Sequence, residues 1–110
     1  MDMLYYIYIG SNRVTIDHLS KIAGGMFMAV SSCNKAAKVI DGIRERYNTS
    51  ILYEESTPQK DSQNITFLHK RFPRVYIILI TEGLQKEHRK LYLQAGVNNT
   101  LSPMASEESL

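Results

Sequence analysis

The stretch Val75-Tyr76-Ile77-Ile78-Leu79-Ile80 is apolar at every position and consists of branched and aromatic side chains. A short run of this kind, without polar alternation, is typical of a strand that is buried on both faces of a parallel sheet. The polar residues Thr81 and Glu82 follow at once, which indicates that the strand ends there at the surface. The stretch therefore predicts a central strand of a parallel sheet.

Similar apolar runs occur along the whole chain, at residues 4–9, 26–30, 51–53 and, more weakly, 97–101. Between them lie stretches in which apolar residues recur at helical spacing, at residues 16–23, 36–47, 65–72 and 84–95. Strands and helices that alternate in this way predict a doubly wound α/β domain with five parallel strands and right-handed crossovers. We expect Met26 and Met28, within the second strand, to belong to the core rather than to a metal site.

Length and composition fit one small globular domain. The chain has 110 residues, of which 44% are hydrophobic and 22% charged, with a formal net charge of +2 and a single cysteine. The first residues do not resemble a signal peptide, and no apolar run is long enough to cross a membrane, so we expect a cytoplasmic protein without membrane contact. Two basic clusters, at residues 69–74 and 86–90, should lie at opposite ends of the sheet, which argues against direct nucleic acid binding.

Polar residues follow the predicted strands at Gly10-Ser11, Ser31-Ser32, Glu54-Glu55, Thr81-Glu82 and Ser102. In an open parallel sheet, ligands bind beyond the carboxyl ends of the strands. These residues are therefore expected to meet at one edge, which is the candidate site.

Three motifs, at residues 54–58, at Thr81 and at residues 95–99, resemble those of the receiver (CheY-like) domain of two-component response regulators. Glu54 and Pro58 match the phosphoacceptor aspartate and the proline four residues after it. Thr81 matches the hydroxyl residue that contacts the phosphoryl group, and the segment Ala95–Asn99 matches the turn before the last strand. The resemblance spans nearly the whole chain and implies a flavodoxin-like sheet with strand order 2-1-3-4-5.

The chain also departs from the receiver pattern, so that it resembles a pseudo-receiver. Gly10 and Ser11 stand where receivers carry an acidic pair, and Glu54 replaces the aspartate. Ser102 or Pro103 occupies the place of a lysine. Phosphorylation of a receiver requires Mg²⁺ held by carboxylates, and the lysine neutralises the acyl phosphate. We therefore expect no phosphorylation, weak Mg²⁺ binding in the millimolar range or worse, and no cofactor.

The leading interpretation is a phosphorylation-independent regulatory domain that is not an enzyme and that acts through a protein partner or a fused effector. By resemblance, the exposed residues Gln85, Lys86, Arg89 and Lys90 of the fourth helix are candidates for contact, including contact within a homodimer. Residues 1–110 form one receiver-like domain, and we expect it to be the N-terminal part of a longer protein. Residues 106–110 resemble the first turn of a fifth helix that is truncated or missing.

Two alternatives concern the same edge. The loop Gly10-Ser11-Asn12 could instead bind a small anionic ligand at the start of the first helix. Glu54 and Glu55 could also mark no more than the point where a buried strand reaches water. Against the second alternative, we expect Glu54 to accept a hydrogen bond from the hydroxyl of Thr81.

Overall fold

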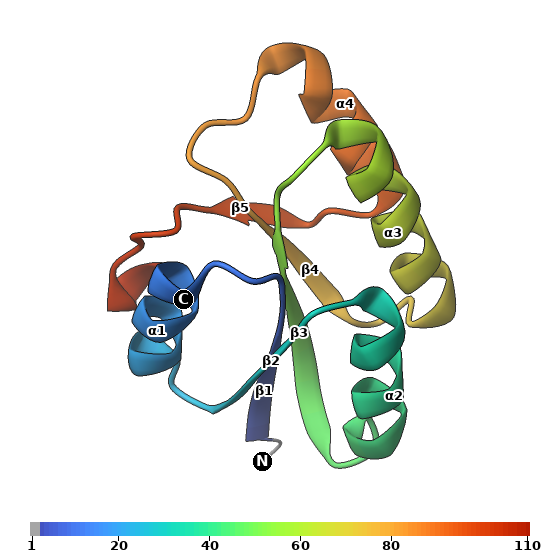
Figure 1. Cartoon of the computed structure of the whole chain (residues 1–110). Coiled ribbons are helices and arrows are strands. Elements are labelled where there is room, and N and C mark those ends of the chain that lie inside the picture. Colours follow the sequence, from blue (N-terminus) through green and yellow to red (C-terminus); the bar gives the residue numbers. More distant parts are fainter. Residues whose placement is uncertain (1–2) are drawn as a thin grey trace.

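The computed structural model describes residues 3–110, which form a five-stranded parallel sheet with helices on both faces (Figure 1). The strands are β1 (Met3–Ile9), β2 (Met26–Val30), β3 (Tyr47–Glu54), β4 (Tyr76–Ile80) and β5 (Asn99–Leu101). The helices are α1 (Arg13–Ile22), α2 (Cys33–Ile43), α3 (Pro58–Arg71) and α4 (Lys86–Ala95), and a short 3-10 turn follows at Glu107–Ser109. The sheet order is β2-β1-β3-β4-β5, which confirms the predicted order 2-1-3-4-5.

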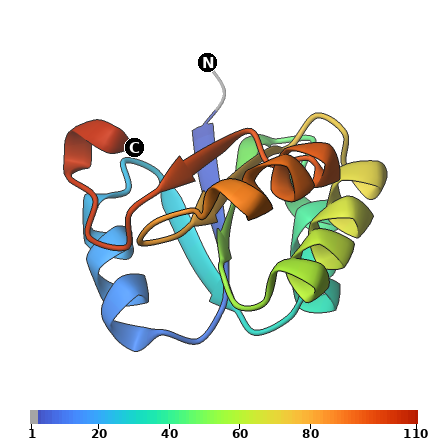
Figure 2. The ribbon, with the colours of Figure 1, turned by 90° about the horizontal axis from the view of Figure 1, so that it is seen from above.

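The sheet separates two hydrophobic layers. Helices α2, α3 and α4 cover one face, whereas α1 and the C-terminal turn lie on the other, as Figure 2 shows from above. Alternate residues of each strand point to opposite layers. In β1, Ile7 packs toward α2 and α3, and its neighbours Tyr6 and Tyr8 pack toward α1. Both layers therefore depend on the continuous apolar runs from which the sheet was predicted.

Two predictions about individual residues are wrong. Tyr47 was assigned to the second helical stripe but begins β3, because this strand pairs with β1 along its full length and the Tyr47 ring packs edge-on against Tyr5 at 5.3 Å. Met26 and Met28 were assigned to the core but are 44% and 39% exposed, because β2 is an edge strand.

The C-terminal segment leaves part of the α1 face of the sheet uncovered. Leu110 packs against the α1 layer, and the carbonyl of Ala105 lies 2.6 Å from the His18 imidazole nitrogen Nε2. After Ser106 the chain forms the 3-10 turn Glu107–Ser109. Leu4 and Tyr76, at the amino ends of β1 and β4, remain 37% and 45% exposed.

Candidate functional site

The carboxyl ends of β1, β3 and β4 surround a polar cavity of about 560 Å³. The predicted site residues Ser11, Glu54 and Thr81 line it, together with Tyr8, Asn12, Thr15, Glu55, Glu82 and Pro103. Gly10 and Ser102 are not among its lining residues. Ser11, Glu54 and Thr81 thus lie together at one edge of the sheet, and the structure adds Tyr8, which lies inside β1.

The carboxylate of Glu54 is held by three hydrogen-bond donors. The hydroxyl of Tyr8 and the backbone N–H of Asn12 donate to Oε1 at 2.9 and 2.8 Å, and the backbone N–H of Ser11 donates to Oε2 at 3.0 Å. Asn12 is the N-cap of α1, where backbone N–H groups and the helix dipole favour a negative charge. Glu54 thus acts as a built-in anion at the start of α1.

Gly10 makes room for this arrangement. A Cβ atom at Gly10 would lie 2.5 Å from Glu54 Oε2 and 2.6 Å from both Glu54 Cβ and Cδ. Gly10 also has a φ of +156°, a value that residues with side chains rarely adopt. The glycine at position 10 and the long acidic side chain at position 54 are therefore one structural unit.

Thr81 contacts the neighbouring carboxylate, which corrects the expected Glu54–Thr81 hydrogen bond. The Thr81 hydroxyl donates to Glu55 Oε1 at 2.7 Å, and the backbone N–H of Glu55 donates to the carbonyl of Ile80 at 3.1 Å. Glu54 points toward α1 because it continues the alternation of β3, whereas Glu55 follows the end of the strand. Both carboxylates accept hydrogen bonds within the protein, which differs from the alternative that they only mark the point where a strand reaches water.

A buried carboxylate that the sequence analysis missed lies behind this edge. Asp61, in the first turn of α3, is fully buried. It accepts hydrogen bonds from the hydroxyls of Tyr53 at 3.1 Å and Tyr92 at 2.9 Å, and from the N–H and hydroxyl of Ser56, both at 2.8 Å. Asp61 therefore connects the loop after β3 to α4.

Burial and nearby carboxylates raise the pKa of three tyrosine hydroxyls. The pKa of Tyr8 is raised mainly by burial and further by Glu54. Burial likewise raises the pKa values of Tyr53 and Tyr92, to which the charge of Asp61 adds. These hydroxyls consequently stay protonated as hydrogen-bond donors to the carboxylates. Burial also raises the pKa of the Cys33 thiol, which disfavours a role as nucleophile.

The edge does not fit a Mg²⁺ ion of the receiver kind. Mg²⁺ requires oxygen ligands in near-octahedral geometry, and several of them are usually carboxylates. Here the oxygens of Glu54 face N–H and O–H donors, and Glu55 accepts the Thr81 hydroxyl. Within residues 3–110, no three His, Cys, Asp or Glu side chains are grouped so that they could hold a metal ion.

The predicted contact residues Gln85, Lys86, Arg89 and Lys90 are all exposed at the start of α4. Lys86, Arg89 and Lys90 share one helix face because they are spaced by three and four residues. Leu93, 59% exposed, lies one turn further along the helix. None of the helices in the described part of the chain has the length and apolar character that a membrane span requires.

The fold is that of the CheY-like receiver domains, as solved structures establish. The CheY-like protein TadZ of Pseudomonas aeruginosa has a TM-score of 0.80 at 12% sequence identity, over 98% of this chain and 87% of that one. The chemotaxis protein CheY4 of Vibrio cholerae has a TM-score of 0.76 at 12% identity, over 99% of this chain and 92% of that one.

An orphan response regulator, described as atypical and as having a phosphorylation-independent regulatory mechanism, has a TM-score of 0.73 at 12% identity. That match covers 96% of this chain and 87% of the other. No protein-family model matches the chain, and no curated protein matches it in sequence. At these identities the likeness establishes the fold alone.

Proposed function

We propose that this chain is a regulatory domain with the receiver fold that works without phosphorylation and without catalysing a reaction. The observation that carries the proposal is the carboxylate of Glu54, which three donors hold at the start of α1. By resemblance, Glu54 stands where receivers carry their phosphoacceptor. Its charge is satisfied by Tyr8 and two backbone N–H groups instead of by a metal ion.

The chemistry of the edge supports this reading. A phosphoryl transfer to Glu54 would need a free oxygen aligned with the incoming phosphorus atom and cations that neutralise the developing charge. Both oxygens of Glu54 already accept hydrogen bonds. Among the described residues that line the cavity there is no lysine or arginine. By resemblance, Ser102 or Pro103 occupies the place of the receiver's lysine.

We further propose that the output surface is the exposed face of α4, and that its partner is a protein or a fused effector. Two contacts fix α4 and the loop before it to the candidate site. Thr81 bonds Glu55, and Tyr92 of α4 bonds the buried Asp61. In this proposal, these hydrogen bonds hold α4 in one position. In the receivers that the chain resembles, phosphorylation has that role.

Residues 1–110 are, in this proposal, one cytoplasmic domain of a longer polypeptide. The apolar side chains of Leu4 and Tyr76 support it, because both remain exposed on the α1 face of the sheet, on either side of β3. A further segment of the polypeptide would bury them. A homodimer is the other way to cover exposed residues, either here or at α4.

The alternative of an external anion at Gly10-Ser11-Asn12 is not favoured. The N–H groups of Ser11 and Asn12 would be its ligands, and both already donate to Glu54. An anion that approached this loop would also meet three carboxylates, those of Glu54, Glu55 and Glu82.

Phosphorylation independence is tested with ¹⁵N-labelled protein and Mg²⁺ plus beryllofluoride, followed by amide NMR. We expect no shifts at residues 54, 55 and 81, and no added phosphate after acetyl phosphate treatment by mass spectrometry. A receiver with a complete acidic set serves as the positive control. Mg²⁺-dependent modification of Glu54 or Glu55 would contradict the proposal.

The output surface is tested separately by sedimentation velocity and by partner binding. If α4 carries the contact, Arg89→Glu should abolish self-association or partner binding, and Arg46→Glu at the other end of the molecule should not. If a second copy covers the α1 face instead, Tyr76→Ser should dissociate the dimer and Arg89→Glu should not. Equal effects of Arg89→Glu and Arg46→Glu would argue against a specific role of α4.

A further inference from the structure

A second cavity, of about 420 Å³, lies at the amino edge of the sheet, opposite the candidate site. The end of α2, the start of β3 and the connection from α3 to β4 surround it. Three arginines line it, Arg44, Arg71 and Arg74, together with Tyr47, Asn48 and Thr49. Its volume lies within the range of small-molecule sites, about 300–1,000 Å³.

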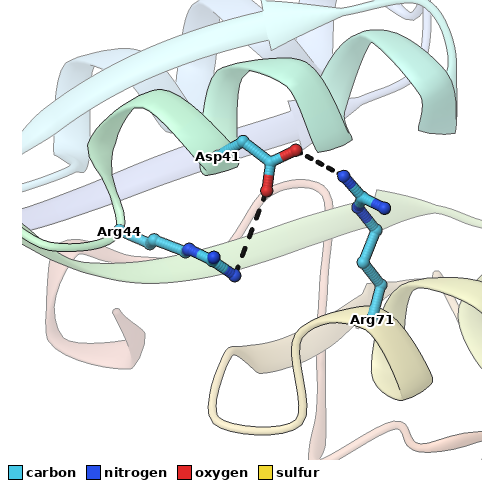
Figure 3. A network of polar contacts seen from close by, with 3 residues as sticks. All are labelled: Asp41, Arg44 and Arg71. Atoms are coloured by element: carbon cyan, nitrogen blue, oxygen red, sulfur yellow. Dashed lines mark hydrogen bonds and ion pairs between the residues drawn. The ribbon is translucent and has the colours of Figure 1, made fainter.

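Two of the arginines are positioned by neighbouring side chains. Asp41 of α2 contacts Arg71 of α3 through Oδ2 and Arg44 through Oδ1, the latter at 4.0 Å, as Figure 3 shows. The Arg71 guanidinium also lies over the ring of Phe72, 5.3 Å from its centre. Asp41 thus brings guanidinium groups from two helices to one side of the cavity.

The charge of this cavity stays positive after its negative groups are counted. Three guanidinium groups, which are always protonated, face one carboxylate. The C-terminal ends of α2 and α3 add about half a negative charge each. A net positive charge of about one therefore remains, and Arg74 has no ion pair among the described residues.

Thr49 provides an independent indication of a ligand. Its side chain lines the cavity and is 9% exposed. Its hydroxyl oxygen is the one buried side-chain polar atom within residues 3–110 that has no hydrogen-bond partner. Buried polar groups are nearly always satisfied, and an unpaired one calls for an explanation. The oxygen itself has almost no contact with solvent, so a bound acceptor would satisfy this hydroxyl once the Thr49 side chain rotates toward the cavity.

We propose that this cavity binds a small molecule that carries phosphate groups. Guanidinium groups donate to phosphate oxygens in pairs, and a phosphate presents enough acceptors to bond several arginines and a hydroxyl together. The cavity is larger than a single phosphate ion, so its occupant is of nucleotide size. The resemblance to receivers does not predict this site, which lies at the other end of the sheet from Glu54.

The test is an amide NMR titration of the ¹⁵N-labelled protein with ATP, pyrophosphate and adenosine, at low and at physiological salt. We expect ATP and pyrophosphate to shift amides of residues 44–49 and 71–75, and adenosine to shift none. Tighter binding of ATP than of pyrophosphate would place the nucleoside in the cavity as well. The proposal would be overturned if adenosine alone shifted these amides. It would also be overturned if ATP at 5 mM, about the weak end of specific binding, shifted none of them.

Three variants separate a specific site from general attraction between charges. Arg74→Ala and Thr49→Val should each weaken ATP binding about tenfold, equivalent to about 1.4 kcal/mol. Thr49→Val removes an unpaired hydroxyl at constant shape, so its urea midpoint should stay unchanged or rise. Arg13→Ala removes the same charge at the opposite edge, from the exposed start of α1, and should weaken binding less than twofold. Equal losses for Arg74→Ala and Arg13→Ala would overturn the proposal.

Discussion

Replacing Glu54 by glutamine tests whether the carboxylate is the built-in anion of α1. The substitution keeps the size of the side chain and removes its charge. In its best orientation, the amide oxygen takes the place of Oε1 and keeps the donors Tyr8 and Asn12. The amide nitrogen then takes the place of Oε2, and the N–H of Ser11 faces another donor.

The size of the effect follows from these contacts. A hydrogen bond to a charged group contributes about 1.5–3 kcal/mol, against about 0.5–1.5 kcal/mol for a neutral one. The charge at the N-terminus of a helix adds about 0.3–1 kcal/mol. Ser11 and Asn12 are exposed, so water replaces part of what is lost. We therefore expect Glu54→Gln to lower the free energy of unfolding by about 1–2 kcal/mol.

Urea unfolding followed by circular dichroism measures this difference, with Glu45→Gln as the matched control. Glu45 is exposed and makes no hydrogen bond or ion pair within the described part of the chain. Amide exchange in the first turn of α1 should also become faster in the Glu54 variant. If both variants lie within about 0.5 kcal/mol of the wild type, the level expected of surface substitutions, the reasoning is refuted.

The other predictions concern the same network. Gly10→Ala places a Cβ atom against Glu54 and should lower the free energy of unfolding by about 1–3 kcal/mol, the usual cost of overpacking. A smaller loss in urea unfolding would contradict the close packing of Gly10 against Glu54. Asp61→Ala leaves the hydroxyl protons of Tyr53 and Tyr92 without an acceptor and should lower the free energy of unfolding by about 3 kcal/mol. An unchanged urea midpoint would show that the network is dispensable. The pKa of Tyr8 is raised above its ordinary value of 10.0, so above pH 10 the folded protein keeps a proton that the unfolded chain releases. The free energy of unfolding should therefore fall as the pH rises above 10. Tyr8→Phe should make this fall less steep by up to about 1.4 kcal/mol per pH unit. An unchanged slope in the variant would contradict the prediction.

Most of the fold follows from the sequence because buried parallel strands are apolar at every position. The run at residues 75–80 and its counterpart at 4–9 are too short for a typical helix and rich in branched and aromatic side chains, which favours strands. Residue boundaries are less certain where two patterns overlap. Tyr47 lies four residues after Ile43 and so continues the helical stripe, yet its ring belongs to the contact with Tyr5 of the neighbouring strand. The pairing of β3 with β1, which extends to Tyr47, decides that this residue belongs to the strand and not to the helix.

The candidate site was predicted at the level of the edge, and its hydrogen bonds were not. Which of two adjacent carboxylates meets Thr81 depends on the alternation of β3 at its last residue. Asp61 was overlooked because an acidic residue in the first turn of a helix is ordinary. Its position did carry a signal, since Asp61, Ile65 and Leu68 lie on one helical face and are all buried.

The close fit of Gly10 and Glu54 restricts the evolutionary routes by which this edge could gain an acidic pair. Any side chain at position 10 would meet Glu54, and the contact with its Cβ atom would persist even if the side chain were shortened to aspartate. Shortening Glu54 first would withdraw the carboxylate from the N–H groups of Ser11 and Asn12. Either first step gives a less stable protein, and the ends of β1 and β3 would have to move apart as well. The present edge is thus a local optimum that single substitutions do not leave easily.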